Sequence, residues 1–179
     1  MSTFEKLQSY FADVNGALLT LNHYEIEKAV EILKRVRENN GTVYLVGNGG
    51  SASTASHFAN DLEKMCSLKA IGVGDMVPKI LAYGNDNGWE NMFSEVLSHN
   101  LRPGDAVVAI SCSGNSPNVV RAAEAACGFE LIVFTGNNYD CLLCQQGASV
   151  IIHAQAEDIK IQEDVHLAIC HAIAGALSN

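Results

Sequence analysis

The sequence has few basic residues: 11 Lys and Arg stand against 20 Asp and Glu, a formal net charge of −9. Proteins that coat nucleic acids bind phosphate through clustered Lys and Arg, so this balance argues against a nucleic-acid partner. A small anionic ligand is still compatible with the charge. A local group of backbone N–H donors can outweigh a distant net charge.

Long apolar runs are also missing. No run approaches the ~18–20 residues of a membrane helix, and the opening MSTFEKLQSY contains no apolar stretch like that of a signal peptide. The six cysteines follow no regular framework, which predicts reduced thiols. We therefore expect a cytoplasmic protein with no membrane partner.

Repeats, linkers and low-complexity tracts are absent, and there are only 3 prolines. A composition of 48% hydrophobic and 17% charged residues is that of a globular protein and excludes disorder. A length of 179 residues predicts one domain, residues 1–179, with a substantial core.

The first 40 residues show two helical stripes of apolar residues at three- and four-residue spacing. The first stripe is Phe4, Leu7, Phe11, Val14 and Leu18, and the second is Ile26, Val30, Leu33 and Val36. Asn39-Asn40-Gly41 favours the end of the second helix. The first stripe packs either on its own domain or against another subunit. We favour the second, which would place residues 1–40 in an oligomer interface.

After Gly41, short apolar runs alternate with helical segments. Runs without polar alternation indicate strands covered on both faces, as in a parallel sheet. The expected strands are 42–46, 68–71, 106–110, 131–134 and 150–152, and the expected helices are 53–62, 77–82, 89–97, 117–126 and 160–177. This order predicts an α/β fold: a doubly wound, three-layer αβα sandwich with a five-stranded parallel sheet.

Ligands of such sheets bind beyond the carboxyl ends of the strands, near a switch in strand order. The first polar turn there is Gly47-Asn48-Gly49-Gly50-Ser51. Its glycines allow close backbone approach to an anion, which the N–H groups of the next helix would face. The spacing matches neither the dinucleotide fingerprint nor the P-loop. An ordinary tight turn explains this segment equally well.

The second polar turn, residues 111–116, reads Ser111-Cys112-Ser113-Gly114-Asn115-Ser116 and precedes Pro117, a residue suited to the first turn of a helix. Hydroxyls and amides at a helix N-terminus can hold a phosphate monoester without a cation. Simple N-capping needs only one such side chain, and this turn offers three serines. Phosphate binding is the better interpretation.

His57 and Asp61 lie four residues apart and therefore share a helix face. Taken alone, such a pair is usually an exposed surface contact. The last helix adds Glu163, Asp164 and His171, so two helices could meet in a nitrogen- and oxygen-rich site suited to zinc. Helical geometry places Asp164 almost over His171 and Glu163 about 80° around the helix.

Together these segments resemble the sugar isomerase (SIS) domain family, and within it the bacterial phosphoheptose isomerases. The resemblance covers nearly the whole chain. It is carried by residues 47–51, by His57-Phe58-Ala59-Asn60-Asp61-Leu62, by residues 111–116 and by Glu163, His166 and His171. It implies interconversion of sedoheptulose 7-phosphate and D-glycero-D-manno-heptose 7-phosphate in a homotetramer with shared active sites.

The resemblance also implies a role for each matching position. Asp61 and His171 would transfer protons, and one zinc ion per subunit would bind the set His57, Asp61, Glu163 and His171. The sugar-phosphate substrate would contact Asn48, Gly49, Gly50, Ser51, Asn85, Asp86, Ser111, Cys112, Ser113, Ser116 and Glu163. The eight-residue interval from Glu163 to His171 is the family's own and favours Glu163 over Asp164.

Three positions depart from the family pattern. Asp61 stands where Glu is usual, Glu163 where Gln is usual and Cys112 where Thr is usual. The change at Cys112 is harmless if its backbone N–H is the contact. The other two leave alternatives open: an isomerase of a different sugar phosphate, or a non-catalytic SIS protein that senses a sugar phosphate or associates with a replication initiator.

Overall fold

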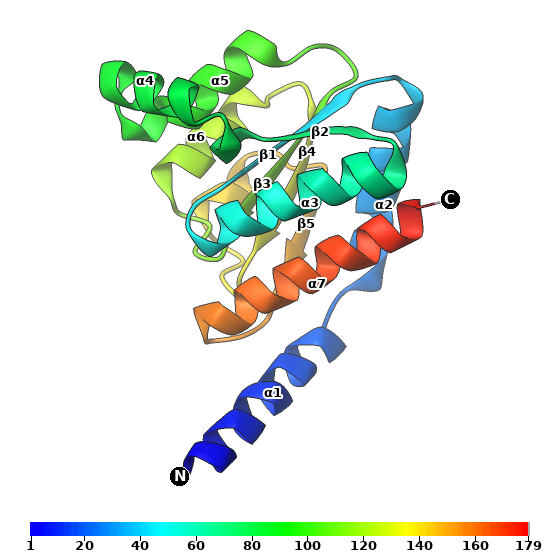
Figure 1. The fold of residues 1–179 in the computed structure, drawn as a ribbon, viewed down its shortest axis with the longest axis vertical. Helices are drawn as coiled ribbons and strands as arrows, with labels where there is room; N and C mark the ends of the chain where they lie inside the picture. Colours follow the sequence, from blue (N-terminus) through cyan, green and yellow to red (C-terminus); the bar gives the residue numbers. More distant parts are fainter. Residues whose placement is uncertain (179) are drawn as a thin grey trace.

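The computed structural model describes residues 1–178, and its centre is a five-stranded parallel sheet. The strands are β1 (Thr42–Gly47), β2 (Lys69–Gly72), β3 (Ala106–Ser111), β4 (Glu130–Thr135) and β5 (Val150–His153). Their order across the sheet is β2-β1-β3-β4-β5 (Figure 1). The order reverses between β1 and β3, which makes that junction the switch point of a doubly wound sheet.

Helices cover both faces of the sheet. Those described are α1 (Thr3–Leu19), α2 (His23–Glu38), α3 (Gly50–Cys66), α4 (Val77–Asn87), α5 (Met92–Asn100), α6 (Pro117–Ala125) and α7 (Ile159–Leu177). The core beneath α2, α3 and α7 takes Val43 and Leu45 of β1, and the core beneath α5 and α6 takes Tyr44 and Val46. The predicted αβα sandwich is therefore confirmed.

All five predicted strands are present, each within one residue of its expected bounds. The apolar runs lack alternation because residues on both faces of the sheet are buried: all six side chains of β3 are buried. Sequence alone could identify these strands because a parallel sheet between two helical layers favours continuous apolar runs rather than alternation.

The helix bounds differ more from expectation. α3 begins at Gly50, earlier than residue 53, because glycine is tolerated at the start of a helix. The expected helix 77–82 was too short: α4 continues to Asn87 and so includes Gly84, Asn85 and Asp86. The predicted helix 89–97 is divided into a 3-10 turn (Trp89–Asn91) and α5.

The first helix, α1, projects from the rest of the molecule and contacts it along α7 (Figure 1). Val14 and Leu18 pack on the core, whereas Phe4 and Phe11 are 68% and 67% exposed. The apolar stripe thus divides between its own chain and the outer surface. A role of residues 1–40 in an oligomer interface stays a prediction.

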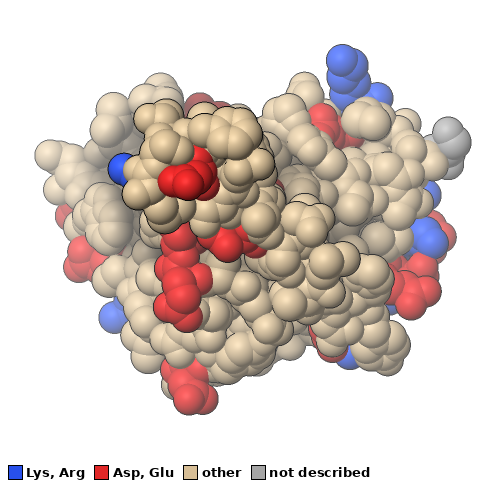
Figure 2. Space-filling model, turned by 90° about the horizontal axis from the view of Figure 1, so that it is seen from below, with Lys and Arg blue, Asp and Glu red and all other residues tan. Residues whose placement is uncertain are grey.

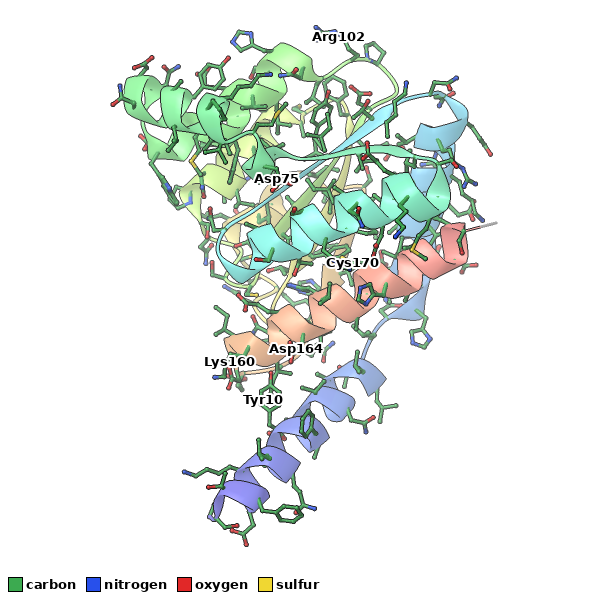
Figure 3. All side chains as sticks on the ribbon, in the orientation of Figure 1. Tyr10, Asp75, Arg102, Lys160, Asp164 and Cys170 are labelled. Atoms are coloured by element: carbon green, nitrogen blue, oxygen red, sulfur yellow. The ribbon has the colours of Figure 1, made fainter. Side chains whose placement is uncertain are left out.

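A hydrogen bond fixes α1 against α7. The Tyr10 hydroxyl donates to Asp164 Oδ2 at 2.5 Å, and the two side chains point toward each other in Figure 3. The Asp164 carboxylate raises the pKa of Tyr10 to about 12, so the phenol keeps its proton at neutral pH. This contact holds the part of α7 that carries Glu163, because Asp164 is the next residue in the chain.

The surface agrees with the acidic composition. Seen from the end at which α1 projects, carboxylate side chains form several groups and basic side chains are few (Figure 2). Within residues 1–178, no helix has the length and apolar character that crossing a bilayer requires.

Candidate active site

The Gly-rich turn joins β1 to α3 at the switch point. Gly49 has a φ of 53° and a ψ of −123°, a conformation that side chains disfavour and that glycine adopts freely. A Cβ on Gly47 would lie 2.7 Å from the carbonyl oxygen of Ser51, so the turn also needs glycine for close packing. Because the N-cap residue is glycine, it offers no side chain to the first N–H groups of α3, which are suited to an anion.

The serine turn joins β3 to α6 on the other side of the switch point. Ser111 Oγ lies 3.4 Å from Ser113 Oγ and 3.5 Å from Ser116 Oγ, so three hydroxyls converge. The Gly114 N–H donates to Ser111 Oγ at 3.2 Å, which orients that hydroxyl. Gly114 itself has a φ of 63° and packs against Cys141, which holds the turn from behind.

The two turns face each other across a cavity of about 260 Å³. Its lining comprises Asn48, Gly49, Gly50, Ser51, Ile110, Ser111, Cys112, Ser113, Ser116, Ile159 and Glu163. Nine of the expected substrate-binding residues therefore surround one cavity. Backbone donors of α3 and hydroxyls of the serine turn together form the kind of site that binds a phosphate monoester.

The thiol of Cys112 does not compete for this role. Its Sγ lies 3.9 Å from Nδ1 of His166, a fully buried side chain. Burial raises the pKa of Cys112 to about 11, so the thiol stays protonated. The backbone of Cys112, rather than its side chain, is thus the part suited to contact a ligand.

The expected metal-binding residues of α3 and α7 meet in a second group. His57 Nε2 lies 3.0 Å from His171 Nε2 and 3.4 Å from Asp61 Oδ2, and His171 Nε2 lies 3.8 Å from the same oxygen. Asp61 is nearly buried and both imidazoles are half-exposed. α3 packs along α7, which fixes the three side chains relative to each other.

This donor set fits a zinc ion. Around tetrahedral zinc with ligands at roughly 2.0–2.1 Å, neighbouring donor atoms are about 3.3 Å apart, close to the three distances observed here. Three protein ligands of this kind leave the fourth tetrahedral position for another ligand. Of the residues described, His57, Asp61 and His171 are the ones that group within the reach of a single ion.

Glu163, the fourth expected ligand, lies elsewhere. Its carboxylate lines the 260 Å³ cavity and packs against Gly50, where it occupies the space that a Cβ at position 50 would need. Glu163 and His171 are eight residues apart on one helix, a rise of about 12 Å. In this chain the Glu163 carboxylate and the group of His57, Asp61 and His171 therefore lie at separate places. Asp164, the residue after Glu163, faces α1 and accepts the hydrogen bond from the Tyr10 hydroxyl.

Asn85 and Asp86 lie at the exposed end of α4, where the Asn85 amide donates to the Asp86 carboxylate at 2.8 Å. They are not part of the lining of the 260 Å³ cavity within residues 1–178. Their expected contact with a substrate stays a prediction that would require a second chain.

Two further residues of the site, Asn118 and Ile159, were not predicted from the sequence. Asn118 is fully buried and its carboxamide pairs with that of Asn48. Ile159, the first residue of α7, adds an apolar wall to the cavity. An asparagine in the first turn of a helix is too common for its sequence position to have marked Asn118 as buried or paired.

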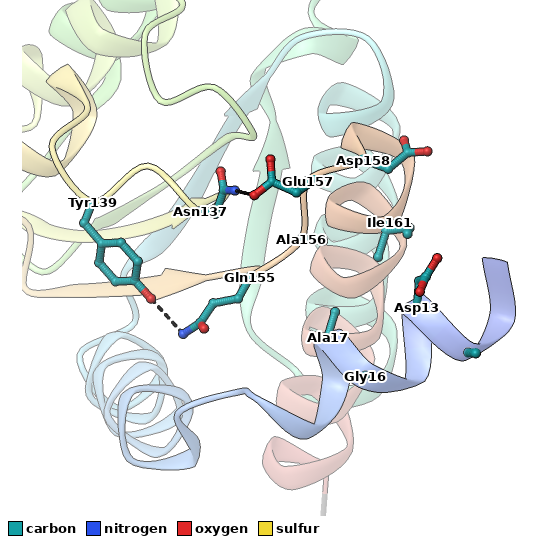
Figure 4. A pocket seen from close by; sticks show the side chains of 11 residues that line it. Asp13, Gly16, Ala17, Asn137, Tyr139, Gln155, Ala156, Glu157, Asp158 and Ile161 are labelled. Atoms are coloured by element: carbon teal, nitrogen blue, oxygen red, sulfur yellow. Dashed lines mark hydrogen bonds between the residues drawn. The ribbon is translucent and has the colours of Figure 1, made fainter. Parts of the chain in front are cut away.

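A larger cavity of about 670 Å³ lies between α1, the segments that follow β4 and β5, and the start of α7 (Figure 4). Asp13, Glu157 and Asp158 line it, and Asn137 donates to Glu157 at 2.9 Å. These three carboxylates repel an anion more strongly than the single Glu163 carboxylate of the smaller cavity, which also offers hydroxyl and backbone N–H donors. The smaller cavity is therefore the candidate for a phosphorylated ligand.

Comparison with known proteins gives consistent matches over the chain. The profile of the SIS domain family matches residues 9–136. The phosphoheptose isomerase of Buchnera aphidicola subsp. Acyrthosiphon pisum (strain Tuc7) is 33% identical over an alignment of 178 positions that covers 91% of each chain. That of Bordetella avium (strain 197N) is 36% identical over an alignment of 148 positions that covers 80% of this chain and 69% of its own. The structure of phosphoheptose isomerase from Neisseria gonorrhoeae superposes with a TM-score of 0.92 at 27% identity, covering 99% of this chain and all of that one.

Proposed function

The chain belongs to the SIS domain family, and we propose that it is a phosphoheptose isomerase that converts sedoheptulose 7-phosphate to D-glycero-D-manno-heptose 7-phosphate. The observation that carries an isomerase function is the group formed by His57, Asp61 and His171. A protein that only binds a sugar phosphate has no need of such a group.

The phosphate of the substrate would bind between the two turns. N–H groups at the start of α3 and the hydroxyls of Ser111, Ser113 and Ser116 would surround its oxygens. Because the phosphate is remote from the reacting carbons, its binding energy would hold the sugar in one pose and lower the barrier of the chemical step.

Proton transfer would fall to Asp61 and His171. Aldose–ketose isomerisation removes a proton from C1 of the ketose and delivers one to C2 through an enediol, while the two oxygens exchange a proton. The nearly buried Asp61 carboxylate suits the carbon-bound proton and the half-exposed His171 imidazole suits the oxygens, although the reverse assignment uses the same geometry.

We further propose one zinc ion per subunit, held by His57, Asp61 and His171, with Glu163 as the fourth protein ligand. A divalent ion supplies polarisation of the substrate carbonyl. The donor distances given above support the first three ligands. Glu163 would have to come from a neighbouring subunit, because it is about 12 Å along the helix from His171 of its own chain.

That separation supports a homo-oligomer with shared active sites, for which a homotetramer is our proposal. The outward half of the α1 stripe, with Phe4, Leu7 and Phe11 exposed, offers apolar surface that assembly would bury. Asn85 and Asp86, which do not line the cavity of their own chain, would reach the site of another. A cytoplasmic location completes the proposal.

The departures at Asp61 and Glu163 favour one alternative, an isomerase of a different sugar phosphate. A carboxylate one methylene shorter on α3 changes the space beside the reacting carbons. A non-catalytic sugar-phosphate sensor is the other alternative, in which the three-residue group would have no catalytic role.

The deciding experiment incubates the purified protein with sedoheptulose 7-phosphate and follows aldose signals by NMR, with and without a chelator. We expect aldose signals that disappear on chelation and return when zinc is restored. Turnover of another ketose phosphate, with none of the heptose, would establish the different-substrate alternative. Binding of the heptose phosphate without turnover of any ketose phosphate would contradict an isomerase.

A further inference from the structure

Asn118 occupies an unusual place behind the cavity. It is the second residue of α6 and its side chain is completely buried. Its Nδ2 donates to Asn48 Oδ1 at 2.8 Å, and Asn48 Nδ2 donates to its Oδ1 at the same distance. The two carboxamides thus form a closed pair between turns that are 70 residues apart in sequence.

The pair bridges the two turns where the sheet no longer does. The last residues paired between β1 and β3 are Gly47 and Ile110, so the backbone ladder stops before either turn begins. Beyond that point the Gly-rich turn must diverge from the serine turn to leave room for a ligand. The amide pair is the cross-link that fixes how far apart they lie.

Each end of the pair is anchored to a helix N-terminus. Asn118 Oδ1 also accepts from the Val119 N–H at 3.0 Å, which fixes the carboxamide on α6. The Asn48 carbonyl accepts from the Ala52 N–H at 3.2 Å in the first turn of α3. The pair therefore couples the positions of the two helices whose N-termini face the cavity.

We propose that Asn118 is a positioning residue for the substrate phosphate. By holding Asn48, it keeps the N–H groups of α3 and the hydroxyls of the serine turn at the separation that one phosphate group requires. This inference rests on the proposed phosphate site. It also assigns a role to the Asn48 carboxamide, which holds the Gly-rich turn in position through its pair with Asn118.

Only an amide at position 118 can satisfy the pair as observed. In Asn118→Asp a carboxylate oxygen would replace the donating NH₂ and face Asn48 Oδ1, so two acceptors would repel each other in a buried place. In Asn118→Ala the Asn48 amide would lose both partners. Either change would let the Gly-rich turn shift relative to the serine turn.

The test measures KM and kcat for sedoheptulose 7-phosphate and the inhibition constant of inorganic phosphate in Asn118→Asp, Asn118→Ala, Asn48→Ala and the double alanine variant. We expect KM and the phosphate constant to rise together, on the order of tenfold, with a smaller change in kcat and unchanged zinc content. Because the two residues act as one unit, KM and the phosphate inhibition constant of the double variant should be no higher than those of either single alanine variant.

Asn100→Asp is the matched control. Asn100 lies on α5, outside the cavity lining, and its amide donates to the Val96 carbonyl at 2.6 Å. Asn100→Asp should leave KM and the phosphate inhibition constant unchanged. A folded Asn118 variant with a lower melting temperature but wild-type KM and phosphate inhibition would overturn the proposal, because its role would then be structural only.

Three other outcomes are also decisive. If neither Asn118 variant folds, Asn48→Ala alone must raise both constants, and unchanged constants there would overturn the inference. If the wild-type protein is not inhibited by phosphate, the proposed phosphate site itself fails and the inference fails with it. Phosphate inhibition in the wild type that Asn118→Asp leaves unchanged overturns the inference alone.

Discussion

The Nε2 atoms of His57 and His171 lie 3.0 Å apart, although 114 residues separate them in the sequence. They face the same oxygen of Asp61, so three donor atoms surround one small volume. Two imidazole nitrogens at this distance either share a proton or share a cation. The nearby carboxylate favours the cation, because it contributes negative charge and a third ligand.

His57→Ala should therefore reduce zinc binding without unfolding the protein, because the His57 side chain is half-exposed. Metal analysis after dialysis against a weak chelator should show near-stoichiometric zinc in the wild type and at least tenfold less in the variant. His23→Ala, which removes an exposed histidine at the start of α2, is the control. Equal zinc in both variants would remove His57 from the site.

Asp61→Asn and His171→Gln should each lower turnover by on the order of 10²-fold or more, as the loss of a general acid or base does. Asp61→Glu restores the residue usual in the family and should keep measurable activity, since the carboxylate is retained. Turnover is measured by NMR at saturating substrate. Near-normal rates in Asp61→Asn or His171→Gln would refute that residue's assignment.

Ser113→Ala should act on binding rather than on turnover. Ser113 is exposed on the serine turn and its hydroxyl also accepts from the Asn115 N–H at 3.2 Å, so the loss weakens one phosphate contact and loosens the turn. We expect KM to rise severalfold with a small change in kcat. Ser98→Ala, on the exposed face of α5, is the matched control. An unchanged KM would count against the phosphate role of Ser113.

The parts of the fold and of the site that the sequence predicted are those determined by residues close together in the chain. The strands were predictable because the centres of β1, β3 and β4 are unbroken apolar runs, and the polar turns because they interrupt those runs. Asn118 could not be found, since its burial depends on a partner 70 residues away. The helical wheel favoured Asp164, but Tyr10 of α1, a tertiary contact that no wheel contains, binds that carboxylate.

The separation of Glu163 from His171 predicts complementation between inactive variants. Glu163→Ala and His171→Gln proteins should each have low activity alone. When they are co-expressed, a hybrid oligomer contains some sites in which both residues are intact, if one chain supplies Glu163 and another His171. Activity of the purified hybrid well above that of either parent is the expected result. A hybrid no more active than its parents would confine the site to one chain.

The fully buried His166 should make the stability of the fold depend on pH. Its Nε2 lies 3.0 Å from the Thr135 carbonyl oxygen, and burial lowers its pKa to about 4 from a usual value of 6.5. Between these values the unfolded chain binds a proton that the folded chain does not, so the free energy of unfolding falls as the pH falls. From pH 7 to pH 5 this one group should cost about 2 kcal/mol.

Urea unfolding at the two pH values measures that loss, and the effect of His166 is isolated by comparison with His166→Asn. The asparagine amide can still donate to the Thr135 carbonyl but does not titrate, so the variant should be less stable at pH 7 and lose about 2 kcal/mol less than the wild type on going to pH 5. His23→Gln removes an exposed histidine and should leave the wild-type pH dependence intact. If His166→Asn lost as much stability as the wild type, carboxylates elsewhere in the chain would account for the pH dependence, and His166 would not be the group that titrates.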